Sequence, residues 1–350
     1  MAARGSMTSP ASPVARAVLL DMTYARKTLV SLNDTPYYHV VARCVRRAWL
    51  WGVDEYAARD YTHRKAWVME RLALQASVFS IDVCAYAIMS NHYHLVVYVD
   101  QARANAWSLS DVVERWTQLF GMPPLVARWQ SGQAQPVERE AAEQLIQRWR
   151  RRLCDISWFM KCLNEHLARR ANAEDDCTGR FWEGRFRSQA LLDEAGLLTA
   201  MSYVDLNPIR AGIAAAPEAS HFTSIYQRIR EMKNAETAGE PAAPHLALRP
   251  FRSLHSSSRN PLPFQLADYL QLVDWSARVI RADDRASIDS SLPPIIQRLT
   301  IDPDAWQLAM QRQGNVFGRA LGRLNHLRLH ARTLGQSWVR GLRQAEHLYT

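Results

Sequence analysis

The sequence predicts an α+β protein, in which an antiparallel sheet carries helices packed mainly on one face. Two observations lead to this class. Residues 37–45, 78–89 and 92–99 are rich in the β-branched and aromatic residues that favour strands. In several other segments apolar residues recur every three or four positions, which is the period of an amphipathic helix. With 350 residues and a hydrophobic fraction of 48%, the chain has ample material for a packed core.

The first half of the chain predicts the element order β-α-β-β. Residues 1–30 resemble a flexible leader, and Pro36 precedes the first strand. A helix is expected over residues 60–76, with Asp60 or Thr62 as its cap. The strands over 78–89 and 92–99 are separated only by the turn at Ser90 and Asn91, so they should form a tight antiparallel hairpin.

The middle of the chain is predicted to be mainly helical. Helical periodicity covers residues 109–120 and then 138–172, which we interpret as one long helix with its own arginine cluster. Residues 130–136 form a surface loop between them, within an insertion at about residues 101–150. A short strand over 186–191 and a helix over 193–205 follow, and Pro208 ends that helix because proline cannot continue the hydrogen-bond ladder.

Composition divides the chain into two domains, residues 31–233 and 263–350. The linker at 234–262 is rich in Ala, Pro and Gly. The second domain is expected to be a small helical appendage, whose apolar positions are interspersed with many arginines. These positions could form an ordinary core face or part of a bundle that faces DNA: Phe317, Leu321, Leu324, Leu334, Trp338 and Leu342.

The charge of +9 and the pI near 9.5 favour a polyanionic partner, because basic residues near phosphates release condensed counterions. Nearly all basic residues are arginines, a bias that codon usage would explain equally well. The five cysteines form no C-x-x-C pair, so free thiols in a reducing compartment are expected. The apolar run at residues 17–20 is too short for a signal segment or a membrane span, which predicts a cytoplasmic protein with no membrane partner.

His92 and His94 are the first candidate site residues. Side chains two positions apart on a strand project from the same face, so two neutral imidazoles placed in this way can share one metal ion. An H-x-H pair also arises by chance in many sequences, where it is an ordinary pair of strand histidines. The position directly after a tight turn, where a sheet meets solvent, favours a site.

Tyr203 and Asn207 are four residues apart, so they should project from one helix face near the helix end. Tyrosine is a weak nucleophile at its ordinary pKa, and a divalent cation would help by polarising a phosphate. On its own, a tyrosine of this kind is more often a packing residue.

The segment GRFWEGRFR at residues 179–187 alternates arginines with aromatic residues. Single-strand binders use this combination, in which arginines contact phosphates and aromatic rings stack on bases. The alternative is a turn and a strand whose aromatic residues pack in the core. The helical pair His326 and His330 has metal-compatible spacing, but no third ligand is near, so we interpret it as structural.

Taken together, four segments resemble the HUH tyrosine transposase superfamily, and most closely its REP-associated branch. They are YYHV at residues 37–40, MSNHYHLVV at 89–97, GRFWEGRF at 179–186 and YVDLNPIRAG at 203–212. Their order and spacing cover roughly residues 31–230. The insertion and the part after residue 240 have no counterpart in the family core.

This resemblance implies a ferredoxin-like sheet and a catalytic domain over residues 31–233. It implies that His92, His94 and Asn207 hold Mg²⁺ or Mn²⁺ and that Tyr203 is the nucleophile. In the family reaction the tyrosine attacks a phosphate of single-stranded or hairpin DNA and forms a 5′-phosphotyrosine link. Oligomeric state, including a homodimer, stays open. The expected DNA-binding residues are Arg43, Arg46, Arg180, Trp182, Arg185, Arg187 and Arg210.

Two alternatives remain. One is a domesticated protein that recognises DNA hairpins without cutting them, although binding alone does not require the complete His, His, Tyr and Asn set. The other is a metal-dependent phosphodiesterase that uses water as its nucleophile.

Overall fold

The computed structural model describes residues 30–45, 53–54, 59–237, 246–253, 260–281, 293–311 and 318–349. Most of the predicted leader lies outside these residues, as do parts of the predicted linker and Phe317. Within the described residues the main sheet has the strand order β4-β5-β1-β6-β7, and a two-stranded sheet pairs β2 with β3. The strands are β1 Tyr37–Arg43, β2 Val53–Asp54, β3 Arg59–Asp60, β4 Ile81–Ile88, β5 His92–Val99, β6 Arg187–Leu191 and β7 Ala320–Leu321.

The helices fall into three groups along the chain. The first contains α2 Arg64–Val78, α3 Gln101–Ala106, α4 Leu109–Thr117, α5 Pro124–Gln130, α6 Pro136–Arg152 and α7 Ile156–Glu174. The second contains α8 Glu194–Asp205, α9 Asn207–Arg210, the 3₁₀ turn η2 Pro217–Ala219 and α10 Ser224–Thr237. The third contains α11 Leu266–Arg281, α12 Pro294–Arg298, α13 Pro303–Gln311, α14 Leu324–Thr333 and α15 Leu342–Leu348.

The elements β1, α2, β4, β5, α7 and β6 form a βαββαβ unit, and its four strands, β1, β4, β5 and β6, pair antiparallel. Helices α2 and α7 lie together on one face, where the Gln75 side-chain amide donates to the carbonyl of Phe159 at 3.0 Å. Arg64 of α2 also pairs with Glu174 and Asp175. This is the ferredoxin-like arrangement that the sequence analysis expected, with its two helices on one face. The α+β class is therefore confirmed.

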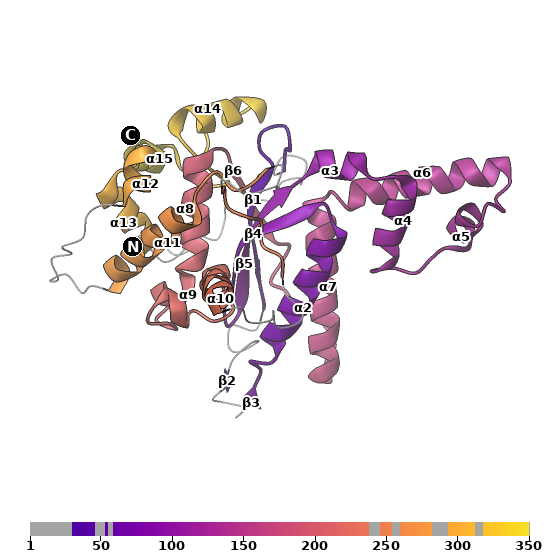
Figure 1. Cartoon of the computed structure of the whole chain (residues 1–350), viewed down its shortest axis with the longest axis horizontal. Coiled ribbons are helices and arrows are strands. Elements are labelled where there is room, and N and C mark those ends of the chain that lie inside the picture. Colours follow the sequence, from indigo (N-terminus) through magenta and orange to yellow (C-terminus); the bar gives the residue numbers. More distant parts are fainter. Residues whose placement is uncertain are drawn as a thin grey trace, which may run out of the picture.

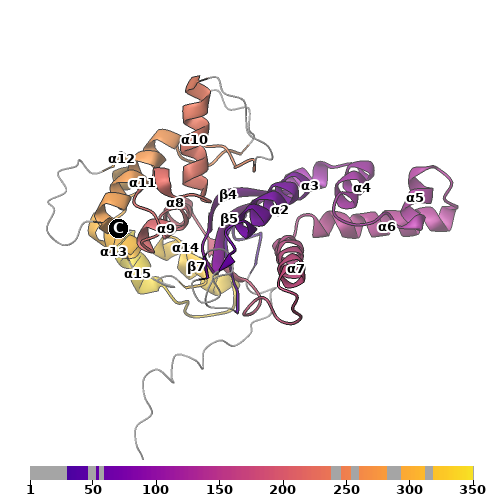
Figure 2. The same ribbon diagram turned by 90° about the horizontal axis from the view of Figure 1, so that it is seen from below.

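The opposite face of the sheet carries α8, α10 and the third group of helices (Figures 1 and 2). Successive residues of β5 point to opposite faces. The Tyr93 hydroxyl donates to the Asn164 side chain of α7 at 2.5 Å, whereas the His94 ring contacts Tyr203 of α8. Both faces of the sheet are thus covered, and the predicted one-face arrangement holds for the ferredoxin-like unit alone.

The prediction of a single long helix over residues 138–172 is wrong. The structure has two helices, α6 and α7, separated at residues 153–155. The Asp155 carboxylate accepts hydrogen bonds from the backbone N–H groups of Ser157 and Trp158, so it caps a new helix that leaves α6 at an angle. Apolar spacing continues through the break because both helices bury one face, and periodicity alone therefore cannot reveal it.

Helices α3, α4, α5 and α6 form an arm that extends away from the sheet (Figures 1 and 2). This arm corresponds to the predicted insertion, and residues 131–135 link α5 to α6 near its far end. Trp116 and Trp149 stack in its interior with ring centroids 5.1 Å apart.

The C-terminal part is helical as predicted, but it also adds a strand to the sheet. Ala190 and Leu191 of β6 pair in parallel with Ala320 and Leu321 of β7. The Tyr269 hydroxyl of α11 donates to the buried Asp205 carboxylate of α8 at 2.5 Å. Sequence periodicity cannot predict a two-residue strand such as β7, since it is too short to show alternation.

Short segments also run beside β4. Val83 bridges in parallel to Leu248, and Ala87 bridges to Thr223. The backbone N–H of Arg249 donates to the Val83 carbonyl at 2.8 Å. Among the described helices, none combines the length and the apolar character that crossing a bilayer requires.

Candidate active site

Three histidines lie together on the face of the sheet that α8 covers. His92 and His94 begin β5, and their ring centroids are 4.9 Å apart. His39 projects from the neighbouring strand β1 and stacks on His94, with ring centroids 5.2 Å apart. Its Nε2 atom is 2.9 Å from Nδ1 of His94. The predicted projection of His92 and His94 from one face is confirmed.

Burial keeps these three imidazoles neutral. His39 is 8% exposed and His94 is 6% exposed. Desolvation lowers the pKa of His39 to about 4 and the pKa of His94 well below its ordinary value. The pKa of His92 is also lowered to about 4, first by desolvation and then by Arg43 and Arg210. Each ring therefore keeps an unprotonated nitrogen at neutral pH, as metal coordination requires.

Helix α8 brings Tyr203 to the same place. Every residue of this helix is buried except Glu194 in its first turn and Tyr203, which is half-buried. The Tyr203 ring meets His94 edge-on, with centroids 6.0 Å apart, and lies 6.3 Å from His39. Tyr203 is therefore partly accessible beside the histidines, while its side chain also packs against the core.

Arg210 lies over the Tyr203 ring, and its guanidinium carbon is 3.8 Å from the ring centroid. Its Nη1 donates to the Met310 carbonyl at 3.1 Å, and its Nη2 donates to the Tyr203 carbonyl at 3.2 Å. The side chain is only 9% exposed. Arg210 was predicted to bind DNA, but its guanidinium donates to two carbonyls inside the protein. Its position indicates that it supports Tyr203.

Asn207, the predicted third metal ligand, is buried at the first residue of α9. Within the described part of the chain its side chain makes no hydrogen bond to His92 or His94. No cluster of three or more His, Cys, Asp or Glu side chains suited to a metal occurs among the described residues. A metal at this place would need an amide or a DNA phosphate to complete the ligands of His92 and His94, so the role of Asn207 stays a prediction.

Two predicted DNA-binding arginines flank the histidines. Arg43 pairs in register with His92, and Arg187 lies across from Val41, which itself faces His94. Residues directly opposite each other in a sheet project from the same face, so both exposed arginines border the histidine face. Arg180 and Arg185 are also exposed in the loop before β6. Arg46 lies outside the described residues.

Trp182 has a packing role. Its indole N–H donates to the Asn164 carbonyl at 2.9 Å, and its ring packs against Tyr93 and Phe181. It is half-buried on the α7 face of the sheet, away from His94. The observed contacts correspond to the core alternative for the segment at residues 179–187, and base stacking by Trp182 stays a prediction.

His39 and Gln189 also belong to this site, although they were not predicted from the sequence. The Nδ1 atom of His39 is 3.3 Å from the Gln189 side-chain oxygen, and Gln189 lies opposite His39 in the β1–β6 register. Strand alternation placed His39 on a definite face, but only the pairing of β1 with β5 and β6 puts that face beside His94. Such pairing links residues 55 and 150 positions apart, which a local pattern cannot show.

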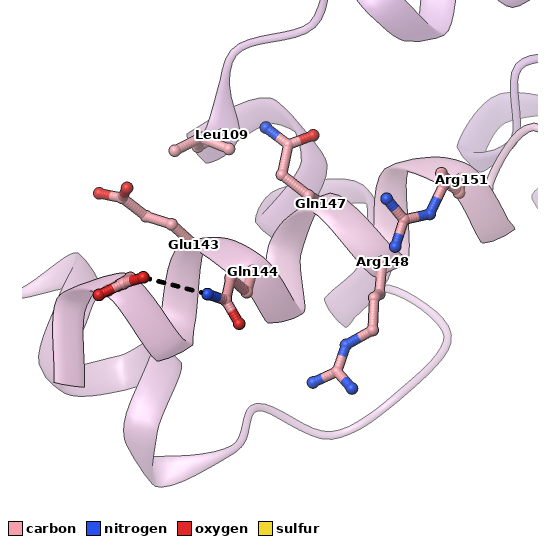
Figure 3. Close-up of a pocket in the computed structure, with 7 residues that line it drawn as sticks. Leu109, Glu143, Gln144, Gln147, Arg148 and Arg151 are labelled. Carbon is pink, nitrogen blue, oxygen red and sulfur yellow. Dashed lines mark hydrogen bonds between the residues drawn. The ribbon is translucent and has the colours of Figure 1, made fainter. Parts of the chain in front are cut away.

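Other polar groups lie away from this site. His326 pairs with Asp193 at 2.6 Å and His330 pairs with Asp34 at 2.9 Å, which agrees with the structural role predicted for them. A hollow of about 500 Å³ lies on the arm, where Gln144 donates to Glu140 (Figure 3). Its lining residues do not include the histidines: Leu109, Glu140, Glu143, Gln144, Gln147, Arg148 and Arg151.

No protein-family model matches the sequence, and no curated protein matches it. Among solved structures, the chain is similar to a REP-associated tyrosine transposase bound to a REP hairpin. The identity is 10% and the TM-score 0.35, over 63% of this chain and 94% of that chain. A similarity at this level is too weak to support either a fold or a function.

Proposed function

We propose that the protein is a metal-dependent enzyme that cleaves and rejoins single-stranded DNA at hairpin sequences, as tyrosine transposases do, with Tyr203 as its nucleophile. The observation that carries this proposal is the half-buried Tyr203 on an otherwise buried helix, whose ring lies 6.0 Å from that of His94.

The donor set is suited to a divalent cation at His92 and His94. Nδ1 of His92 is 2.7 Å from the Asn91 side-chain oxygen, and Nδ1 of His94 is bound to His39. Both rings can therefore offer Nε2, and hydrogen-bonded partners of this kind orient metal-binding histidines. Asn207 is the proposed third ligand. A mixed imidazole and amide set accepts Mg²⁺ or Mn²⁺, which when bound would polarise the scissile phosphate.

In the proposed reaction the Tyr203 hydroxyl loses its proton as its oxygen bonds to the phosphorus, and the bond from phosphorus to the 3′ oxygen breaks as that oxygen takes up a proton. The products are a 5′-phosphotyrosine link and a free 3′-hydroxyl. Because the new ester conserves the phosphodiester bond, a second hydroxyl can attack it and rejoin the strand. Arg210 lies over the Tyr203 ring and donates to the Tyr203 carbonyl, so it holds the phenol in position. Arg43, Arg180, Arg185 and Arg187 supply charge for the DNA phosphates.

The test is covalent capture of DNA. Purified protein, Mn²⁺ and 5′-labelled or 3′-labelled hairpin oligonucleotides carrying single-stranded flanks are mixed, and the label that stays with the protein after denaturation is measured. We expect Tyr203→Phe to abolish the adduct. Tyr226→Phe, which changes another half-buried tyrosine on α10, should retain it. An adduct of undiminished yield in Tyr203→Phe would refute the assignment of the nucleophile.

A second candidate is a hairpin-binding protein without catalysis. It is favoured by one observation, that the described residues contain no group of three or more His, Cys, Asp or Glu side chains arranged to hold a metal ion. Hairpin binding that is unaffected by a chelator, with no adduct over many candidate strands, would identify this case. A phosphodiesterase that uses water would instead retain cleavage in Tyr203→Phe and form no adduct in the wild-type protein.

A further inference from the structure

A chain of hydrogen bonds runs from His94 to the backbone of the C-terminal part. Nδ1 of His94 is 2.9 Å from Nε2 of His39, and Nδ1 of His39 is 3.3 Å from the side-chain oxygen of Gln189. The Gln189 amide nitrogen donates to the Gly318 carbonyl at 2.7 Å. Three strands, β5, β1 and β6, thus connect in a row to the residue that leads into β7.

The Gly318 carbonyl, which ends this series of hydrogen bonds, determines which atom donates in each of them. A carbonyl can only accept, so the Gln189 amide must turn its nitrogen toward Gly318 and its oxygen toward His39. That oxygen also only accepts, so His39 must carry its proton on Nδ1. A neutral His39 then presents a lone pair at Nε2, and His94 must donate from Nδ1.

The neutral form of both rings follows from their surroundings. Both side chains are more than nine-tenths buried, and no carboxylate is among their hydrogen-bond partners within the described residues. A buried charge without such a partner would be strongly unfavourable. With its proton on Nδ1, a neutral His94 has its remaining lone pair on Nε2.

We infer that His39 and Gln189 are positioning residues, which hold His94 in the single tautomer that can offer Nε2 to a metal ion. This inference rests on the metal-binding role in the proposed function, but not on Tyr203. It assigns a role to His39, the third histidine of the site, whose two ring nitrogens are occupied by hydrogen bonds.

The last acceptor in this series of hydrogen bonds, the Gly318 carbonyl, is held in place by its surroundings. Gly318 lies so close to the backbone carbonyl of Arg340 that a Cβ atom would not fit there. The backbone N–H of Ala190 also donates to the Arg319 carbonyl at 2.9 Å, which secures the next residue to β6. The C-terminal part therefore acts on His94 from a fixed position, through one carbonyl and two side chains.

The test uses the full chain without DNA. His39→Phe removes the acceptor for His94 and keeps a flat ring, His39→Gln restores an amide oxygen, and Gln189→Leu leaves His39 without its partner. Val96→Ala is the matched control, because Val96 is buried and lies opposite His39 in the sheet. Two properties are measured: the His94 tautomer, from imidazole ¹⁵N shifts of metal-free protein, and the affinity for Mn²⁺ alone, by electron paramagnetic resonance.

We expect wild-type His94 to be protonated on Nδ1. His39→Phe should lose this preference and bind Mn²⁺ about 10- to 100-fold more weakly, the usual effect of removing such a partner. His39→Gln should recover most of the affinity, Gln189→Leu should lose part of it, and Val96→Ala should alter neither property.

Three results would overturn the inference: an unchanged tautomer in His39→Phe, an unchanged affinity there, or an equal loss in Val96→Ala. If His39→Phe does not fold, Gln189→Leu decides by the same criteria. Because no measurement involves DNA cleavage, a wrong nucleophile would leave these results intact. A failed positioning role would in turn leave the covalent adduct of the wild-type protein intact.

Discussion

A guanidinium placed 3.8 Å above a tyrosine ring, as Arg210 is above Tyr203, attracts both the π electrons and any negative charge on the phenol oxygen. The planar guanidinium group also donates hydrogen bonds to two carbonyls, those of Met310 and Tyr203. A lysine could not make both bonds while it covers the ring. At the scale of single residues, Arg210 is therefore the main support of the proposed nucleophile.

We expect Arg210→Lys to reduce the single-turnover rate of adduct formation by roughly tenfold, which corresponds to about 1.4 kcal/mol of transition-state stabilisation. The rate is measured with Mn²⁺ and DNA in excess. Arg185→Lys, at an exposed loop arginine, is the control and should retain most of the rate. An unchanged rate in Arg210→Lys would mean that the guanidinium fork has no part in the reaction.

The buried histidines also predict how stability depends on pH. The pKa of His39 is about 4 in the folded protein and near 6.5 when unfolded. The unfolded state therefore binds more protons between these values, so stability is complete above pH 6.5 and falls as the pH decreases toward 4. The shift corresponds to roughly 3 kcal/mol for this group.

Urea unfolding at pH 4.5, 5.5, 6.5 and 7.5, with chelator present, measures this dependence. We expect His39→Gln to show a clearly smaller loss of stability on acidification than the wild type. The variant is compared with the wild type because burial also raises the pKa of Asp205 in both proteins. A raised carboxyl pKa stabilises the folded state as the pH decreases, which opposes the effect of His39. Parallel curves for the two proteins would contradict the buried, neutral state of His39.

At the scale of elements, the sequence predicted well what local patterns determine. The strands β4 and β5, the turn between them and the helix α8 follow from composition, alternation and capping. The break between α6 and α7 was missed because Asp155 lies among apolar positions that continue in step on both sides. The two-residue strand β7 could not be predicted, since its place depends on pairing with β6 more than 120 residues away.

The approach of β7 to α8 gives a prediction at this scale. A Cβ atom at Gly196 would lie 2.5 Å from the Leu321 carbonyl oxygen, and backbone cannot move aside as a flexible side chain can. We expect Gly196→Ala to reduce the free energy of unfolding by about 1–3 kcal/mol, the usual cost of overpacking. Gly121→Ala is the control, because nothing lies within 4 Å of its Cβ position. Equal stability of the two variants in urea would contradict the close packing.

At the scale of the whole molecule, the C-terminal part is built into the sheet domain. The Asp205 carboxylate, two residues after Tyr203, is fully buried and accepts hydrogen bonds from Ser224, Ile225 and Tyr269. Tyr349 likewise meets Thr199 of α8 at 2.8 Å. Sequence patterns could suggest the histidine pair and Tyr203, but not that helices 60 to 150 residues further on hold the tyrosine helix in place.

Because Tyr269 donates to a carboxylate, we expect Tyr269→Phe to reduce the free energy of unfolding by about 2 kcal/mol. Tyr349→Phe loses a bond between two neutral hydroxyls and should cost about 1 kcal/mol. Urea unfolding followed by tryptophan fluorescence and by circular dichroism measures both. The two signals should change together in each variant. Separate transitions would show that the C-terminal part unfolds independently of the sheet.

The segments beside β4 and β6 cover backbone groups that an open sheet edge would expose. Outer strands of open sheets expose N–H and C=O groups that can recruit a strand from another molecule, with aggregation as a frequent result. Here Ala320 and Leu321 occupy the outer side of β6, while Leu248, Arg249, Ser224 and Phe222 satisfy backbone groups of β4. At these positions the backbone groups of β4 and β6 are occupied within the protein, so a strand from a second copy cannot pair with them.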